Sequence, residues 1–191
     1  MSYFIRAIEP SDHPFLWELL YQALYVPPTA APLPREIIYQ PKLAKYVQDW
    51  GRHGDMGCIA VFEANKALVG AAWLRLLKFE HRGYGYIDDE MPELAVAVLP
   101  KDRGQGIGTK LLIHLFEQAK RGYSNISLSV SVDNPALRLY RRLGFEVVEH
   151  DDNSLTMKRI LVKGLSGCLR SSAVPIQRAG LFQPHIVFPM P

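Results

Sequence analysis

The sequence predicts one α/β (α+β) domain, a mixed central sheet with helices on its faces. Three observations support this prediction. The expected elements follow the order β-α-α-β-β-β-α-β-α-β-β, in which strands and helices are interleaved. Residues 94–99 form an apolar run without polar alternation, which is typical of a central strand buried on both faces. A chain of 191 residues with 48% hydrophobic composition buries one sizeable core and leaves too little for two ordinary domains.

The first half of the chain predicts a strand, two helices and a hairpin. Residues 3–8 alternate as a strand does, and apolar residues then recur at helical spacing over 15–24, after an N-cap at Ser11-Asp12. Prolines exclude regular structure in the loop 26–41, and a second short helix is expected over about 43–50. Two apolar, β-branched runs, 58–63 and 67–78, predict a hairpin.

The second half predicts two more helices and three strands after the central one. An amphipathic helix is expected from Gly106 to about Arg121, and residues 126–132 alternate as a strand. Asn134-Pro135 starts the next helix, with Asn134 as N-cap, and Gly144 ends it. Residues 145–148 and 155–160 supply a last hairpin.

Charge and cysteine content exclude several classes of function. The formal net charge of +3 arises in the tail, where residues 161–191 carry three basic residues and no acids. Because phosphate binding needs clustered Lys and Arg, we expect no nucleic-acid partner, and an RNA-associated or scaffold role has weak support. Cys58 and Cys168 resemble neither a disulfide framework nor a metal-ligand pair, so no metal is expected.

The chain also shows no membrane or export signal. Its start lacks a charged region followed by an apolar run, and no stretch approaches the roughly 18 apolar residues of a membrane span. We therefore expect a soluble cytoplasmic protein without a membrane partner. The domain is expected over residues 1–162, and 163–191 form a tail or extension of unknown role. Two interpretations of the tail stay open: it is disordered, or it packs on a neighbour, which would allow a homodimer.

The sharpest chemical signal is the glycine-rich segment Arg103-Gly104-Gln105-Gly106-Ile107-Gly108, between a buried strand and a helix. Glycines there allow a tight turn that directs free N–H groups at the positive end of the helix dipole, which favours a phosphate or pyrophosphate. A plain turn is an equally good interpretation of the glycines alone. The segment is neither a Walker loop, which needs Gly-Lys-Ser/Thr, nor a Rossmann fingerprint, because Thr109 stands where the third glycine belongs.

The segment resembles motif A of the GNAT superfamily of acyl-CoA N-acyltransferases, Arg/Gln-x-x-Gly-x-Gly/Ala, at Arg103, Gly106 and Gly108. Downstream, residues 133–145 resemble motif B, Asn-x-x-Ala-x-x-Leu-Tyr-x-x-x-Gly-Phe. Both motifs occur in the family's order and separation, and the resemblance covers roughly residues 3–160. It implies a mostly antiparallel sheet of about six to seven strands with helices on both faces, and acetyl-CoA as co-substrate.

The resemblance also implies roles for individual residues. The backbone of Val96, Ala97 and Val98 would hold the pantetheine arm, and Tyr140 would be the general acid that protonates the departing CoA thiolate. The alternative for Tyr140 is a half-buried aromatic ring whose hydroxyl is satisfied. The remaining cofactor-binding residues implied are those of motif A and the start of its helix: Arg103, Gly104, Gln105, Gly106, Ile107, Gly108 and Thr109.

Asn134 departs from the family pattern, because the family asparagine usually stands three residues before the alanine, where this chain has Asp133. Asn134 is counted among the cofactor-binding residues, and a helix cap is its alternative role.

The general base is expected to be Glu93, a carboxylate at the start of the central strand. The acids 88–90 lie just upstream, either as a solvated turn or as part of an acceptor site that favours a cationic amine. His81 is a weaker candidate for proton transfer.

The function expected is acetyl transfer from acetyl-CoA to a small-molecule or peptide amine, by direct attack in a ternary complex. The alternative is a non-catalytic acyl-CoA-binding sensor or partner module of the same fold. The family resemblance further implies that the loop 26–41 covers the acceptor pocket.

Overall fold

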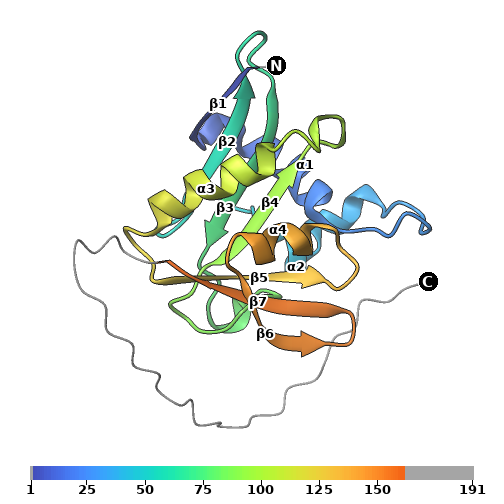
Figure 1. Ribbon diagram of the computed structural model, residues 1–191, viewed down its shortest axis with the longest axis vertical. Helices are drawn as coiled ribbons and strands as arrows, with labels where there is room; N and C mark the ends of the chain where they lie inside the picture. Colours follow the sequence, from blue (N-terminus) through green and yellow to red (C-terminus); the bar gives the residue numbers. More distant parts are fainter. Residues whose placement is uncertain (1, 162–191) are drawn as a thin grey trace.

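A single seven-stranded sheet organises the computed structural model, which describes residues 2–161 (Figure 1). The strand order is β1-β2-β3-β4-β5-β7-β6, and every neighbouring pair is antiparallel except β4 and β5, which are parallel. The strands are β1 Tyr3–Ala7, β2 Met56–Phe62, β3 Leu68–Arg75, β4 Glu93–Val98, β5 Asn125–Ser131, β6 Glu146–Asp151 and β7 Ser154–Ile160. The predicted mixed, mostly antiparallel sheet is therefore confirmed.

Helices cover both faces of this sheet. The helices are α1 His13–Ala23, α2 Pro41–Ala44, α3 Ile107–Ala119 and α4 Ala136–Arg142, and short 3₁₀ turns join them to the strands. Along β3, Ala72 and Leu74 pack in the cluster that contains α3, whereas Ala71 and Trp73 pack in the cluster that contains α1. This alternation is the period of two that a strand imposes. Figure 1 shows α3 crossing the near face and α1 lying behind the sheet.

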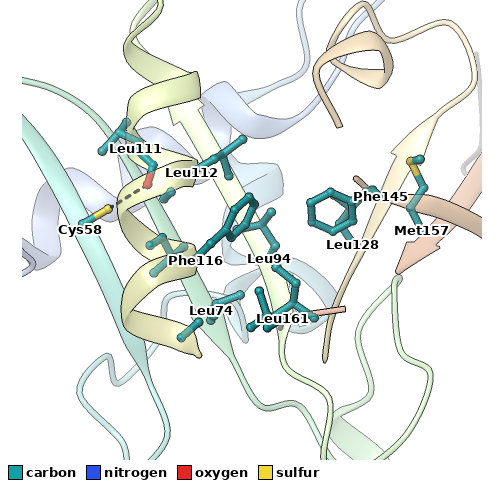
Figure 2. Packing of buried hydrophobic residues seen from close by; sticks show 14 of the residues in the cluster. Cys58, Leu74, Leu94, Leu111, Leu112, Phe116, Leu128, Phe145, Met157 and Leu161 are labelled. Carbon is teal, nitrogen blue, oxygen red and sulfur yellow. Dashed lines mark hydrogen bonds between the residues drawn. The ribbon is translucent and has the colours of Figure 1, made fainter. Parts of the chain in front are cut away.

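The core beneath α3 is apolar and contains Cys58 (Figure 2). The Cys58 thiol lies 3.4 Å from the Leu111 carbonyl oxygen, and its burial raises the pKa to about 12. A thiol with this pKa is almost entirely protonated at neutral pH and is a poor nucleophile.

The second helix is shorter than predicted. α2 ends at Ala44, and residues 45–49 continue as turns in place of the helix expected to residue 50. The cause is Arg75, whose guanidinium binds the carbonyl oxygens of Lys45, Gln48 and Asp49. Because those carbonyl oxygens bind Arg75, they are not available to continue the helix. Asp49 also adopts a positive φ of 52°, which a right-handed helix does not allow. The loop 26–41 is also not wholly irregular, because residues Arg35–Tyr39 form a 3₁₀ helix.

Two predicted helix caps differ from the structure. Asp12 precedes α1, but its carboxylate makes two bonds to the Arg6 guanidinium and accepts the Glu9 N–H. α4 begins at Ala136, and Asn134 caps it from one residue before the N-cap, by accepting the Ala136 N–H at 2.9 Å. The predicted tail, 163–191, lies outside the described residues.

Candidate active site between β4 and β5

The two parallel strands separate immediately after they meet. Their register contains one pair, Glu93 with Ser127, and the Ser127 N–H donates to the Pro92 carbonyl. In the rest of the sheet β4 pairs with β3 over six residues, and β5 pairs with β7 over seven. Within residues 2–161, no strand therefore lies beside the edge of β4 beyond Glu93.

Backbone alternation identifies which β4 groups face this gap. The Leu99 N–H donates to Val69 on the β3 side at 2.8 Å, so residues 93, 95, 97 and 99 direct their N–H and C=O groups at β3. Val96 and Val98 direct theirs at the gap. Among the three residues expected to hold a pantetheine arm, the geometry therefore favours Val96 and Val98, while the backbone of Ala97 belongs to the β3 ladder.

The N-terminus of α3 lies next to the end of β4 and supplies free donors. Within residues 2–161, none of the backbone N–H groups of residues 104–109 donates to a protein acceptor. A helix normally leaves four such groups, and here the preceding loop adds more. Gly104 and Gly106 each have φ of 76°, a left-handed conformation that side chains rarely adopt, and open space surrounds the Cβ position of both. The tight glycine turn and the free N–H groups that the sequence predicts are present, and anion binding by them stays a prediction.

Two arginines bracket this loop. Arg103 donates to the Val98 carbonyl at 2.9 Å and to the Gln22 carbonyl at 3.2 Å, so its side chain ties the loop to β4 and α1. Arg142 at the end of α4 reaches the Thr109 hydroxyl at 3.5 Å. It places a second cation beside the free N–H groups, although motif comparison does not single it out.

Tyr140 lies on α4 and packs against the core, edge-to-face with Phe145 at 5.8 Å between ring centroids. Burial raises the pKa of its hydroxyl to about 12. This hydroxyl makes no hydrogen bond with any residue in the described part of the chain. The role of Tyr140 as general acid therefore stays a prediction, and so does its alternative as a packing residue. The Tyr140 proton stays on the oxygen at neutral pH, as a general acid requires.

Glu93 is 3% exposed at the start of β4, and its side chain faces the sheet surface covered by α1 and α2. Its Oε2 accepts the Tyr46 hydroxyl at 2.8 Å and the Gly85 N–H at 2.7 Å, while Oε1 is buried without a partner in the described residues. Burial raises the pKa of Glu93, against the opposing effects of these two hydrogen bonds, of the Lys45 charge and of the Gly83 backbone. A raised pKa makes the carboxylate a stronger base.

The upstream acids lie in a different environment. Asp88 and Glu90 line a hollow of about 350 Å³ together with Gly122 and Tyr123, which follow α3, and Glu93 does not line it. These acids therefore line a hollow separate from Glu93, and their role at an acceptor site stays a prediction. His81 is exposed and pairs with Glu80. The Asn134 side chain is engaged in capping α4.

Motif reasoning misses Tyr46, Gly83 and Gly85 because all three act through tertiary contacts. Tyr46 stands 47 residues before Glu93, and the only signal in the sequence is the Gly-Tyr-Gly run at 83–85.

Comparison with known proteins identifies the family of this chain and agrees with its fold. The sequence profile of the acetyltransferase (GNAT) family matches residues 17–145. No curated protein matches the chain. Among solved structures, the PaiA N-acetyltransferase of Thermoplasma acidophilum with coenzyme A superposes with a TM-score of 0.59 at 20% identity, over 84% of this chain and 99% of its own.

Two further structures are similar. The YncA protein of Salmonella typhimurium, solved with its cofactor acetyl-CoA, has a TM-score of 0.59 at 21% identity, over 87% of this chain and 98% of its own. The ribosomal-protein-alanine N-acetyltransferase of Brucella melitensis has a TM-score of 0.56 at 26% identity, over 83% of this chain and 99% of its own.

Within residues 2–161, no helix combines the length and apolar character needed to cross a membrane.

Proposed function

Because the chain belongs to the GNAT family of acetyltransferases, we propose that it transfers the acetyl group of acetyl-CoA to an amine by direct attack in a ternary complex. The observation that carries this proposal is the set of backbone groups that face the gap along the β4 edge, together with the free N–H groups of residues 104–109 at the start of α3. These groups fit a ligand that carries phosphates for the N–H groups, an arm with amides for the β4 edge, and a thioester at its end. Acetyl-CoA is that ligand.

In the bound complex, the N–H groups of residues 104–109 hold the pyrophosphate at the positive end of α3. Arg142 adds charge on the same side, and Arg103 keeps the loop in place through its bonds to β4 and α1. The pantetheine amides pair with Val96 and Val98 as a neighbouring strand would. The thioester then lies near the start of β4, between Glu93 and α4.

Two side chains each transfer one proton in the reaction: Glu93 accepts one, and Tyr140 donates one. Glu93 removes a proton from the ammonium form of the acceptor, directly or through water, and the neutral amine attacks the thioester carbon. A main-chain N–H of β4 that faces the gap polarises the carbonyl. As the C–S bond breaks, Tyr140 donates its proton to the thiolate, and the proton that the new amide nitrogen sheds restores Tyr140. The buried, protonated Cys58 supports direct attack over an acetyl-enzyme.

Binding of acetyl-CoA is tested by its effect on melting temperature. A ligand that binds only the folded state adds RT ln(1 + [L]/Kd), about 2.7 kcal/mol at a hundredfold excess over Kd. Gly106→Asp should abolish the shift, because the carboxylate occupies the phosphate position. Gly106→Asn is the matched control: it carries the same left-handed backbone strain without the charge, and both residues tolerate that conformation.

We expect Gly106→Asn to keep part of the shift and Gly106→Asp to lose it. An unmoved melting temperature for the unmodified protein at millimolar acetyl-CoA would count against the proposal as a whole. A full shift in the aspartate variant would mean that residues 104–109 form only a turn.

A further inference from the structure

The carboxylate of Glu93 is held on one side only. Both hydrogen bonds converge on Oε2, from the Tyr46 hydroxyl and the Gly85 N–H, and Oε1 has no partner in residues 2–161. Tyr46 in turn accepts the Tyr84 N–H at 2.8 Å, which commits the phenolic proton to Glu93. The result is a directed chain from Tyr84 N–H through the Tyr46 hydroxyl to Glu93.

Two glycines allow this arrangement to close. A Cβ on Gly83 would stand 2.1 Å from Glu93 Oε1 and 2.4 Å from the Tyr46 oxygen. A Cβ on Gly85 would stand 2.5 Å from the Leu128 carbonyl carbon on β5. Neither glycine has a positive φ, so the close approach, and not the backbone conformation, requires glycine at these positions. The turn 83–85 therefore fits between Glu93 and β5 because it has no side chain at either end.

Contacts with Trp73 and Tyr84 hold Tyr46 itself in place. The Trp73 indole N–H donates to the Tyr46 carbonyl at 3.0 Å, and the Tyr46 and Tyr84 rings stack with planes 3° apart. The turns on either side are fastened by Arg75, which binds the Lys45 carbonyl and pairs with Asp55 at 2.6 Å. A hydroxyl anchored in this way has little freedom to leave Glu93.

We infer that Tyr46, together with the turn 83–85, is a positioning residue that fixes Oε2 of Glu93 and leaves Oε1 as the oxygen that takes the proton of the acceptor amine. This inference rests on the proposed role of Glu93 as general base. Since Oε1 is buried against Gly83, the proton of the acceptor amine reaches it through a bridging water. Tyr46 and the turn 83–85 hold Oε2 during this step and keep Oε1 directed at the acceptor.

The charged and titratable groups around Glu93 determine how its pKa changes when the Tyr46 hydroxyl is removed. Lys45 is the cation that acts on it, and the Gly85 N–H, the Tyr46 hydroxyl and the Gly83 backbone complete its polar surroundings. Arg75 stands opposite Glu93 on β3, but its charge is paired with Asp55. Removal of the Tyr46 hydroxyl therefore takes away one hydrogen bond that favours the charged carboxylate and leaves that of the Gly85 N–H.

The test compares pH profiles of kcat/KM with one acceptor throughout, so that the pKa of the amine is constant. In Tyr46→Phe, the acidic limb should move to higher pH, with a loss of about tenfold or more on the acidic side that shrinks as pH rises. Acetyl-CoA affinity should stay unchanged. Tyr123→Phe is the matched control, because its hydroxyl makes a similar bond of 2.7 Å to the Gly54 carbonyl away from Glu93; its profile should match the unmodified protein.

A second variant keeps the inference testable if Tyr46→Phe folds poorly. Gly83→Ala places its methyl group against Oε1 and should lower kcat with little change in acetyl-CoA binding. An unshifted limb in Tyr46→Phe, with a uniform loss that follows its melting temperature, would show a merely structural tyrosine and overturn the inference. Glu93→Gln in the same series separates the two levels: full turnover in that variant refutes the general base itself, whereas its loss alongside an unshifted Tyr46→Phe limb refutes only the positioning role.

Discussion

Glu93→Gln should raise the stability of the folded protein and lower its activity, because the buried site of Glu93 disfavours a charged carboxylate. Glu93 is 3% exposed, and burial is the main cause that raises its pKa above the ordinary value of 4.5. A raised folded-state pKa means that the folded protein binds this proton more tightly than the unfolded chain does. The corresponding stability is present below the unfolded pKa and is lost as pH rises through the folded pKa.

Glutamine cannot ionise, so the variant does not lose this stability as pH rises. Its amide oxygen can accept both bonds now made to Oε2, from Tyr46 and Gly85. The melting temperature of Glu93→Gln relative to the unmodified protein should therefore rise between about pH 4 and neutral pH. Turnover should fall by ~10²–10⁴-fold, the usual contribution of a general base.

The assay is thermal unfolding across this pH range, in parallel with acetyl-CoA turnover at neutral pH. Glu63→Gln, at an exposed carboxylate after β2, removes the same charge without changing burial and serves as the control. A stability difference that stays constant with pH, or that falls as pH rises, would refute the reasoning about desolvation. Full turnover would refute the catalytic role.

Three further predictions follow from the site and its support. Tyr140→Phe should lower kcat by ~10²–10⁴-fold with little change in KM, and less for a thioester of a more acidic thiol; an unchanged kcat where chemistry limits the rate would make Tyr140 a packing residue. Cys58→Ala should retain turnover, because the thiol is protonated and buried; loss of turnover in a folded variant would indicate an acetyl-enzyme. Arg75→Met should lower the free energy of unfolding by about 3–5 kcal/mol in urea, because it leaves Asp55 charged and buried, and adding Asp55→Asn should restore part of the loss.

Local periodicity predicts most of this fold. The strand at 94–99 and the amphipathic helix from Gly106 lie within a residue or two of β4 and α3, because a buried apolar run and an apolar stripe are produced by neighbouring residues. The glycine-rich loop was also predictable, since Gly106 is needed for its left-handed conformation wherever the rest of the chain lies. Such features depend on a few consecutive residues.

The errors arise where a distant residue decides the outcome. The helix expected over 43–50 stops early because Arg75, on β3, binds its carbonyl oxygens. Asp12 does not cap α1 because Arg6, on β1, takes its carboxylate. For the same reason the sequence predicts Glu93 from its place at a strand start but not Tyr46, which reaches it across 47 positions.

The central claim is acetyl transfer to an amine, and product detection tests it most directly. The protein is incubated with acetyl-CoA and a panel of polyamines, amino acids and peptides with free N-termini. Free thiol and acetylated amine are measured together, with Tyr140→Phe as the paired variant. We predict equal amounts of both products for at least one amine and a large loss in Tyr140→Phe. Acetyl-CoA binding without an acetylated product from any amine would contradict the claim and support a non-catalytic acyl-CoA sensor.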